Sequence, residues 1–234
     1  MTDSDPRTSR RQLLSLGVGL GAAGLFGALA WAAPPVDART SEQRRLDNRL
    51  ELWGTFARKT RTNLIARYSS VRTSSLLRED LVGGGTLAFV NPATLVLRDD
   101  SATGSTTRIE RQGIRIATND PSLPERSLPP RAEAPAMRWL ADHLVACFAP
   151  GDGQALLADA RAEVPRGRAP RLSLMPPRES PARAIIRSLT LTFDPVGGAV
   201  VEIEIAESDG GTFTLALSDH RQNEAPEALA RVLD

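Results

Sequence analysis

Histidine and cysteine, the side chains that most often bind metals or act as nucleophiles, are scarce in this chain. His143 and His220 are the only histidines, and neither has a cysteine, histidine or carboxylate at metal-ligand spacing. The single cysteine, Cys147, excludes an internal disulfide, and its apolar neighbours favour a buried structural thiol over a reactive one. We therefore expect no metal site and no cofactor.

The carboxylates and the glycine-rich segments do not form a catalytic motif either. Asp99 and Asp100 fit the end of a strand, and Glu202 and Glu204 fit a solvated strand face better than an acid-base pair. The sequence has no Gly-x-Ser-x-Gly elbow, and the three glycines at 83–85 lack the lysine and following helix of a phosphate-binding loop. We therefore predict that the protein is not an enzyme.

The composition favours one globular domain without strong electrostatic partners. The chain has 29 lysines and arginines against 28 aspartates and glutamates, a net charge of +1, and its basic residues are scattered. We therefore expect no nucleic-acid partner. Without a leader, about 200 residues would remain, enough for a single domain with a sizeable core.

Residues 1–38 predict an export signal. Arg10 and Arg11 precede an uncharged run rich in glycine and alanine over 13–30, a layout typical of a twin-arginine signal. A retained membrane anchor is the alternative, because the run is about long enough to cross a bilayer. Cleavage after Ala32 or Ala38 would release the mature protein into the periplasm.

Downstream of the signal, residues 39–234 alternate between helical and strand-like hydrophobic spacing. Apolar residues three and four apart predict helices, and strict alternation predicts antiparallel strands with one apolar and one polar face. The predicted elements are a helix from Ser41, hairpins over 63–118, a loop without secondary structure over 121–135, helices over 135–148 and 154–162, and a closing meander over 172–217.

These elements offer more apolar side chains than the first helix alone can cover. Such residues are most simply core, and the second possibility is a cavity for an acyl chain. Hydrocarbon binds with about 0.8 kcal/mol per buried methylene and needs no special motif. The candidate cavity residues are Leu87, Phe89, Leu95, Leu97, Leu189, Leu191, Phe193, Ile203, Phe213 and Leu215, and the candidate lid residues are Trp139, Leu140, Leu144 and Phe148.

The order of the elements and the turn residues between them resemble the LolA family of periplasmic outer-membrane lipoprotein carriers. Four stretches carry the resemblance: the first helix leading into 64–68, the strand and turn at 85–92, the strand at 171–177 that ends in proline, and the meander over 186–217. Together they cover most of residues 42–230, and their order and spacing are more specific than any one motif.

The resemblance implies an α+β fold, an unclosed antiparallel β half-barrel wrapped around an N-terminal helix and lid helices. It also implies a monomeric carrier that receives lipoprotein acyl chains from an inner-membrane ABC-type release complex and delivers them to an outer-membrane receptor. The helices over 135–148 and 154–162 would be the lid. A lipid-sensing or protein-interaction module of the same fold is the alternative, and an enzyme built on such a half-barrel is a third.

The chain departs from the family pattern at two places. Asn91 stands before the turn proline, where the best-known carriers have an arginine that helps to hold the lid closed. Asparagine cannot supply that charge or its forked donors. Residues 111–116 contain no aromatic side chain where the family has an aromatic-rich strand. The resemblance is therefore compatible with a divergent carrier of another lipid or lipoprotein.

Overall fold

The computed structural model describes residues 40–74, 78–110, 113–120, 122–127 and 134–233, so the predicted export signal lies outside the described residues. Within these ranges, eleven strands form one antiparallel sheet in the order β6-β5-β4-β3-β2-β1-β11-β10-β9-β8-β7. The strands are β1 (Asn63–Thr73), β2 (Leu81–Val90), β3 (Thr94–Asp99), β4 (Ser105–Glu110), β5 (Gly113–Thr118), β6 (Arg126–Ser127), β7 (Arg161–Glu163), β8 (Arg171–Met175), β9 (Ile186–Phe193), β10 (Val200–Glu207) and β11 (Thr212–Gln222).

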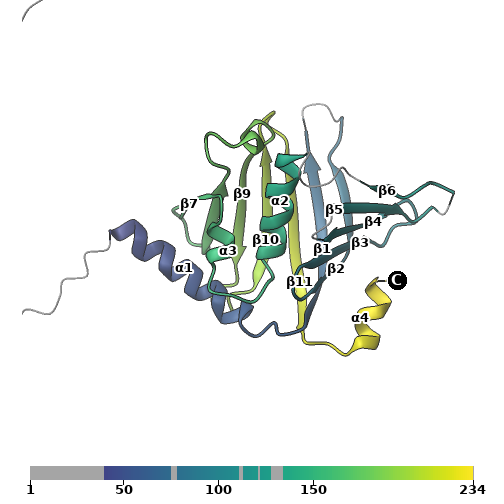
Figure 1. Ribbon diagram of the computed structural model, residues 1–234, viewed down its shortest axis with the longest axis horizontal. Helices are drawn as coiled ribbons and strands as arrows, with labels where there is room; N and C mark the ends of the chain where they lie inside the picture. Colours follow the sequence, from purple (N-terminus) through teal and green to yellow (C-terminus); the bar gives the residue numbers. More distant parts are fainter. Residues whose placement is uncertain (1–39, 75–77, 111–112, 121, 128–133, 234) are drawn as a thin grey trace, which may run out of the picture. The chain divides into compact units, whose positions relative to one another are not determined.

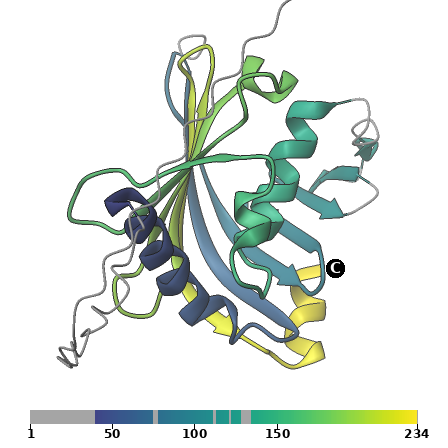
Figure 2. The ribbon, with the colours of Figure 1, turned by 60° about the vertical axis from the view of Figure 1, so that its left-hand side comes forward.

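The sheet curves and leaves its two edges apart (Figures 1 and 2). β1 lies at its centre and is hydrogen-bonded to β2 on one side and to β11 on the other. β6 and β7 form the two edges and do not pair with each other. The barrel is therefore unclosed, and the α+β half-barrel architecture expected from the sequence is confirmed.

Two helices cover the concave face. α1 (Ser41–Ala57) begins at Thr40, whose hydroxyl accepts a hydrogen bond from the backbone N–H of Gln43 at 3.1 Å. α2 (Pro135–Ala146) begins with a proline, which suits the first turn because that position has no intrahelical N–H partner. Trp53 of α1 is buried and its Nε1 donates to the carbonyl oxygen of Cys147 at 2.9 Å. This bond ties α1 to the end of α2.

Two details of the middle segment were predicted incorrectly. The helix expected over 154–162 is only one turn, α3 (Gln154–Leu157), because Ala158 is extended and Asp159 adopts a φ of 51°. The chain then enters the edge strand β7. The loop expected over 121–135 contains the short strand β6, which pairs with β5.

Side chains on the concave face form apolar rows across neighbouring strands, the arrangement that stabilises a half-buried sheet. From β8 to β11, one row contains Leu172, Leu191, Ile203 and Leu215, and the next contains Leu174, Leu189, Ile205 and Phe213. From β1 to β5, one row contains Leu64, Phe89, Leu95, Ile109 and Ile114, and the next contains Ala66, Leu87, Leu97, Thr107 and Ile116. The period-two pattern thus selects the face that turns toward α1 and α2.

A C-terminal helix, which the sequence analysis did not predict, covers part of the convex face. α4 (Pro226–Leu233) presents a narrow apolar stripe to a small patch of the sheet. The contacting residues are Leu229, Val232 and Leu233 of the helix and Ile65, Ala88 and Val96 of strands β1 to β3. These three strand residues point away from the main core, so α4 removes from water an apolar patch that α1 and α2 cannot reach.

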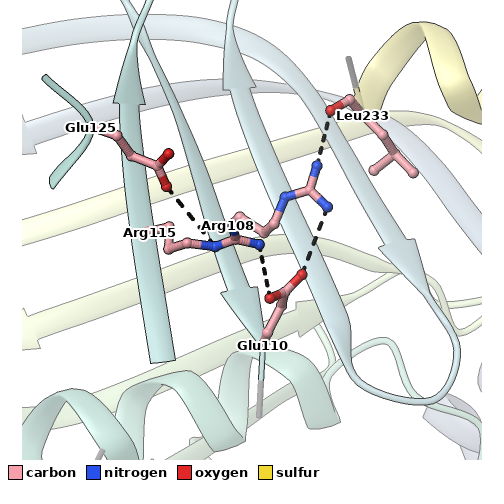
Figure 3. A network of polar contacts seen from close by, with 5 residues as sticks. All are labelled: Arg108, Glu110, Arg115, Glu125 and Leu233. Carbon is pink, nitrogen blue, oxygen red and sulfur yellow. Dashed lines mark hydrogen bonds and ion pairs between the residues drawn. The ribbon is translucent and has the colours of Figure 1, made fainter. Parts of the chain in front are cut away.

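Arg108 on the convex face holds the last turn of α4 and belongs to a network of ion pairs (Figure 3). Arg108 of β4 donates from Nη2 to the carbonyl oxygen of Leu233 at 2.9 Å, and its Nη1 lies 3.7 Å from Glu110. Arg115 of β5 contacts the same glutamate at 3.1 Å and Glu125 at 4.0 Å. Cations at a helix C-terminus complement its carbonyl groups, so this network stabilises the docked helix.

Candidate functional site

α2 and the concave face enclose an apolar cavity of about 440 Å³. α2 runs across the sheet and contacts both β3 and β9, one strand from each half (Figures 1 and 2). The cavity is lined by Arg72, Leu97, Thr107, Ile109, Ile114, Ile116, Met137, Leu140, Ala141, Leu144, Ile185, Ile186, Ile205, Glu207, Phe213 and Leu215. Ligand sites commonly have volumes of about 300–1,000 Å³ and mostly apolar walls with a few polar groups, which is the character of this cavity.

Each wall of the cavity comes from a different part of the chain. Strands β3 to β5 supply one wall, with Ile109 and Ile114 facing each other across the β4–β5 pair. Strands β10 and β11 supply the other through the cross-strand pair Ile205 and Phe213. α2 closes the space between them with Met137, Leu140, Ala141 and Leu144. The cavity therefore exists only while α2 lies against both halves of the sheet.

Five of the residues selected from the sequence line this cavity. They are Leu97, Phe213 and Leu215 from the candidate cavity set and Leu140 and Leu144 from the candidate lid set. The other seven candidate cavity residues lie in the closed core, each at most 1% exposed: Leu87, Phe89, Leu95, Leu189, Leu191, Phe193 and Ile203. They belong to one buried cluster with Trp53 of α1 and Leu156 of α3, whose side chains help to fill that part of the half-barrel.

The remaining two candidate lid residues are buried apart from the cavity. Trp139 is 5% exposed and Phe148 is 3% exposed. Nε1 of Trp139 donates to the carbonyl oxygen of Asp159 at 2.8 Å, which ties α2 to the segment that follows α3. Both residues hold the helix in place, and neither borders the enclosed space.

Sequence reasoning did not select most of the cavity lining. Ile109, Ile114 and Ile116 lie in the predicted hairpins, and their alternation was a usable signal for the concave face. Arg72 and Glu207 carried no such signal, because they are far apart in the sequence and meet only when β11 aligns beside β1 and β10. The pair lies at the cavity, where Nη2 of Arg72 contacts Oε1 of Glu207 at 2.9 Å.

His143 and Trp139 stack on the side of α2 that lies away from the cavity. Their ring centroids are 4.0 Å apart, and Nδ1 of His143 lies 2.7 Å from the carbonyl oxygen of Trp139. Burial lowers the pKa of His143, and hydrogen bonding together with the charges of Asp142 and Asp159 opposes that shift. The buried His143 ring is therefore part of the packing of α2, stacked on Trp139.

Cys147 and His220, the other two side chains considered for chemistry, also have structural roles. Cys147 is fully buried, as predicted, and burial raises the pKa of its thiol well above the usual range. Nε2 of His220 lies 2.9 Å from the carbonyl oxygen of Val200, and its ring meets Phe56 edge-on at 5.5 Å between centroids. In the described part of the chain, no group of three or more histidine, cysteine or carboxylate side chains could hold a metal ion.

Asn91 forms hydrogen bonds with the segment that follows α1. Its Nδ2 donates to the carbonyl oxygen of Arg61 and its backbone N–H donates to that of Thr62, both at 2.9 Å. The residue therefore joins the β2–β3 turn to the connection between α1 and β1. Side-chain hydrogen bonds of Trp53 and Trp139 help to hold α2 and the segments around it.

No protein-family model and no curated protein matches the sequence. Similar solved structures include a LolA superfamily protein from Nitrosomonas europaea, at 10% identity and a TM-score of 0.43, covering 78% of this chain and 95% of that one. A DUF1329 family protein from Desulfovibrio piger is similar at 6% identity and a TM-score of 0.42, covering 76% and 93%. Lipoprotein LppX from Mycobacterium tuberculosis is similar at 13% identity and a TM-score of 0.38, covering 77% and 96%.

The unclosed antiparallel sheet, with α1 and α2 on its concave face, is the arrangement that the resemblance noted in the sequence implies. Among the helices that the structure describes, none combines the length and the apolar character needed to cross a membrane.

Proposed function

We propose that the protein is a non-enzymatic periplasmic carrier that shelters the acyl chains of lipoproteins or of another lipid beneath α2. It would take this cargo from an inner-membrane ABC-type complex and deliver it to an outer-membrane receptor, after export through a twin-arginine signal at residues 1–38. The observation that carries the proposal is the apolar cavity of about 440 Å³ between α2 and the two halves of the sheet.

The volume and the lining set the size of the cargo. An apolar cavity of about 150 Å³ holds one benzene molecule, so 440 Å³ corresponds to about three, or roughly one chain of 15 to 20 carbons. Ten buried methylenes would contribute about 8 kcal/mol. That gain exceeds the lower estimates of the association cost, about 4 kcal/mol, so one chain can be held without a covalent step.

The interactions that fasten α2 to the rest of the protein suit a lid that must open. Besides the packing of its seven buried residues, two tryptophan hydrogen bonds help to fasten α2 and its flanking segments, and a typical intramolecular hydrogen bond contributes only about 1 kcal/mol net. Met137 and Leu140 are only partly buried, because the cavity lies beneath them. Opening of α2 would admit the acyl chain, and the bound chain, which contacts α2 in the cavity, would shift the population back toward the closed arrangement.

The first test is to identify what the protein carries. We expect solvent extraction of protein purified from the periplasmic fraction to release acylated molecules, detected by mass spectrometry, and a neutral apolar fluorophore to compete with them. Ile116→Glu places a charge in the cavity wall and should leave the protein empty, whereas Ala117→Glu on the exposed opposite face of β5 should not. A folded Ile116→Glu variant with unchanged lipid content would contradict the proposal.

A further inference from the structure

The cavity has one charged end. Among the lining residues that the structure describes, Arg72 and Glu207 alone carry charge, and thirteen of the sixteen are apolar. The Arg72 side chain is 49% exposed and that of Glu207 is 20% exposed. The pair therefore lies where the cavity meets solvent, and the apolar walls begin directly behind it.

The register of the strands shows which end this is. Arg72 lies opposite Phe213 of β11 on one side and opposite Leu81 of β2 on the other. Phe213 lines the cavity, whereas Leu81 is 57% exposed. Ile185, which also lines the cavity, is 55% exposed. The ends of β1 and β11 near the β1–β2 connection thus form an open mouth with a cation at its rim.

The chemistry of Arg72 fits an anion better than a neutral group. A guanidinium group has five N–H donors in a planar fork that matches a carboxylate or a phosphate, and the contact with Glu207 is made by one nitrogen, Nη2. The walls behind it can take only hydrocarbon. A molecule that satisfies both regions has an acidic group at one end of an acyl chain.

We infer that Arg72 binds the acidic group of an anionic amphiphile, a carboxylate or a phosphate, whose hydrocarbon chain occupies the cavity beneath α2. This inference rests on the proposed function and names the class of cargo. Glu207 is the partner of Arg72 in this structure and contacts one of its nitrogens, so the incoming anion binds the remaining guanidinium donors and competes with Glu207 for the charge. The acidic group therefore adds only a small net binding free energy, comparable to that of one exposed ion pair.

The test compares two probes that differ only in the end group. A neutral apolar fluorophore, N-phenyl-1-naphthylamine, is bound to the full mature chain and displaced by dodecanoate or by dodecan-1-ol at about pH 8, where the carboxylic acid is ionised. We expect dodecanoate to bind about fivefold more tightly than the alcohol, a ratio that falls at high salt. Dodecyl phosphate in a third arm distinguishes a preference for phosphate from one for carboxylate.

Three variants test whether Arg72 causes the preference for dodecanoate over dodecan-1-ol. Arg72→Gln should bind dodecanoate and dodecan-1-ol equally well, and Arg72→Lys should keep part of the preference because it keeps the charge. Glu207→Gln should increase the preference, because it removes the competing carboxylate. Arg67→Gln is the matched control: Arg67 also lies on β1 and is 50% exposed in an ion pair with Asp100 at 2.7 Å, but it does not line the cavity.

The outcomes separate this inference from the proposed function. Equal binding of the two probes by the unaltered protein, or a preference that survives in Arg72→Gln, would overturn the role of Arg72 and leave the cavity intact. Failure of every probe to displace the fluorophore would instead contradict the proposed function. Loss of the preference in Arg67→Gln would show that a general surface potential, and not Arg72, attracts the anion.

Discussion

Filling the cavity should abolish acyl binding without unfolding the protein, and two neighbouring threonines allow a controlled test. Thr107 of β4 lines the cavity, whereas Thr106 points to the opposite face of the same strand, where it borders Arg98 and Leu233. Both side chains are partly exposed, so neither substitution must displace a closed core. We therefore compare Thr107→Trp with Thr106→Trp.

The expected loss of binding affinity follows from the cavity volume that the tryptophan side chain would fill. A tryptophan side chain is larger than the benzene that fills a cavity of about 150 Å³, so it removes at least about a third of the 440 Å³ beneath α2. Excluding about five methylenes at 0.8 kcal/mol each costs about 4 kcal/mol. Partial rearrangement of the chain recovers some of this, so we expect Thr107→Trp to weaken dodecanoate binding at least about a hundredfold.

The assay is displacement of the neutral fluorophore, with thermal unfolding as the test of folding. Thr106→Trp should bind dodecanoate within about threefold of the unaltered protein, because its indole lies on the other face. Unchanged affinity in a folded Thr107→Trp variant would refute the assignment of the cavity as the binding site. Equal losses in both variants would refute it as well, because the loss would then come from the strand and not from the filled volume.

Three further predictions concern stability. Burial lowers the pKa of His143, so the unfolded chain binds the proton first as the pH falls. The unfolding free energy should therefore decrease below about pH 6.5. His143→Gln should flatten this pH dependence by up to about 1.4 kcal/mol per pH unit. Gly198 has a φ of 76°, and a Cβ there would collide with the carbonyl oxygen of Leu52 in α1. Gly210 has a φ of 92°, but no atom lies near the position of its Cβ. In urea unfolding, Gly198→Ala should therefore lower the unfolding free energy by at least about 2 kcal/mol more than Gly210→Ala. Val232→Asp should lower stability by about 1–2 kcal/mol through loss of the α4 contact while leaving cavity binding unchanged, and an unaltered unfolding midpoint would contradict the packing of α4.

Local spacing predicts the elements whose residues alternate regularly. The first helix and the two antiparallel meanders follow from period and order, because one face of each element must be buried, whereas the unclosed form of the sheet was implied by the family resemblance. α4 was missed because its apolar stripe is short and only the patch around Val96 gives it a partner. α3 ends at Leu157, because Ala158 is extended and Asp159 adopts a positive φ, backbone conformations that propensity does not reveal.

The candidate site was predicted in outline and not in detail. Alternation selects the concave face, but it does not distinguish the part that α1 fills from the part that α2 leaves open. Leu191 and Leu215 show the difference, since they lie in one cross-strand row separated by Ile203, yet only Leu215 lines the cavity. Arg72 and Glu207 meet through long-range strand pairing, which no local pattern contains.

A crystal structure of the protein grown with 12-bromododecanoic acid tests the central claim most directly, because the anomalous signal of bromine locates the end of the hydrocarbon chain. We predict a bromine peak beneath α2, among Leu140, Ile116 and Leu215, with the carboxylate toward Arg72. A bromine peak confined to another surface, with α2 seated on an empty cavity, would contradict the account.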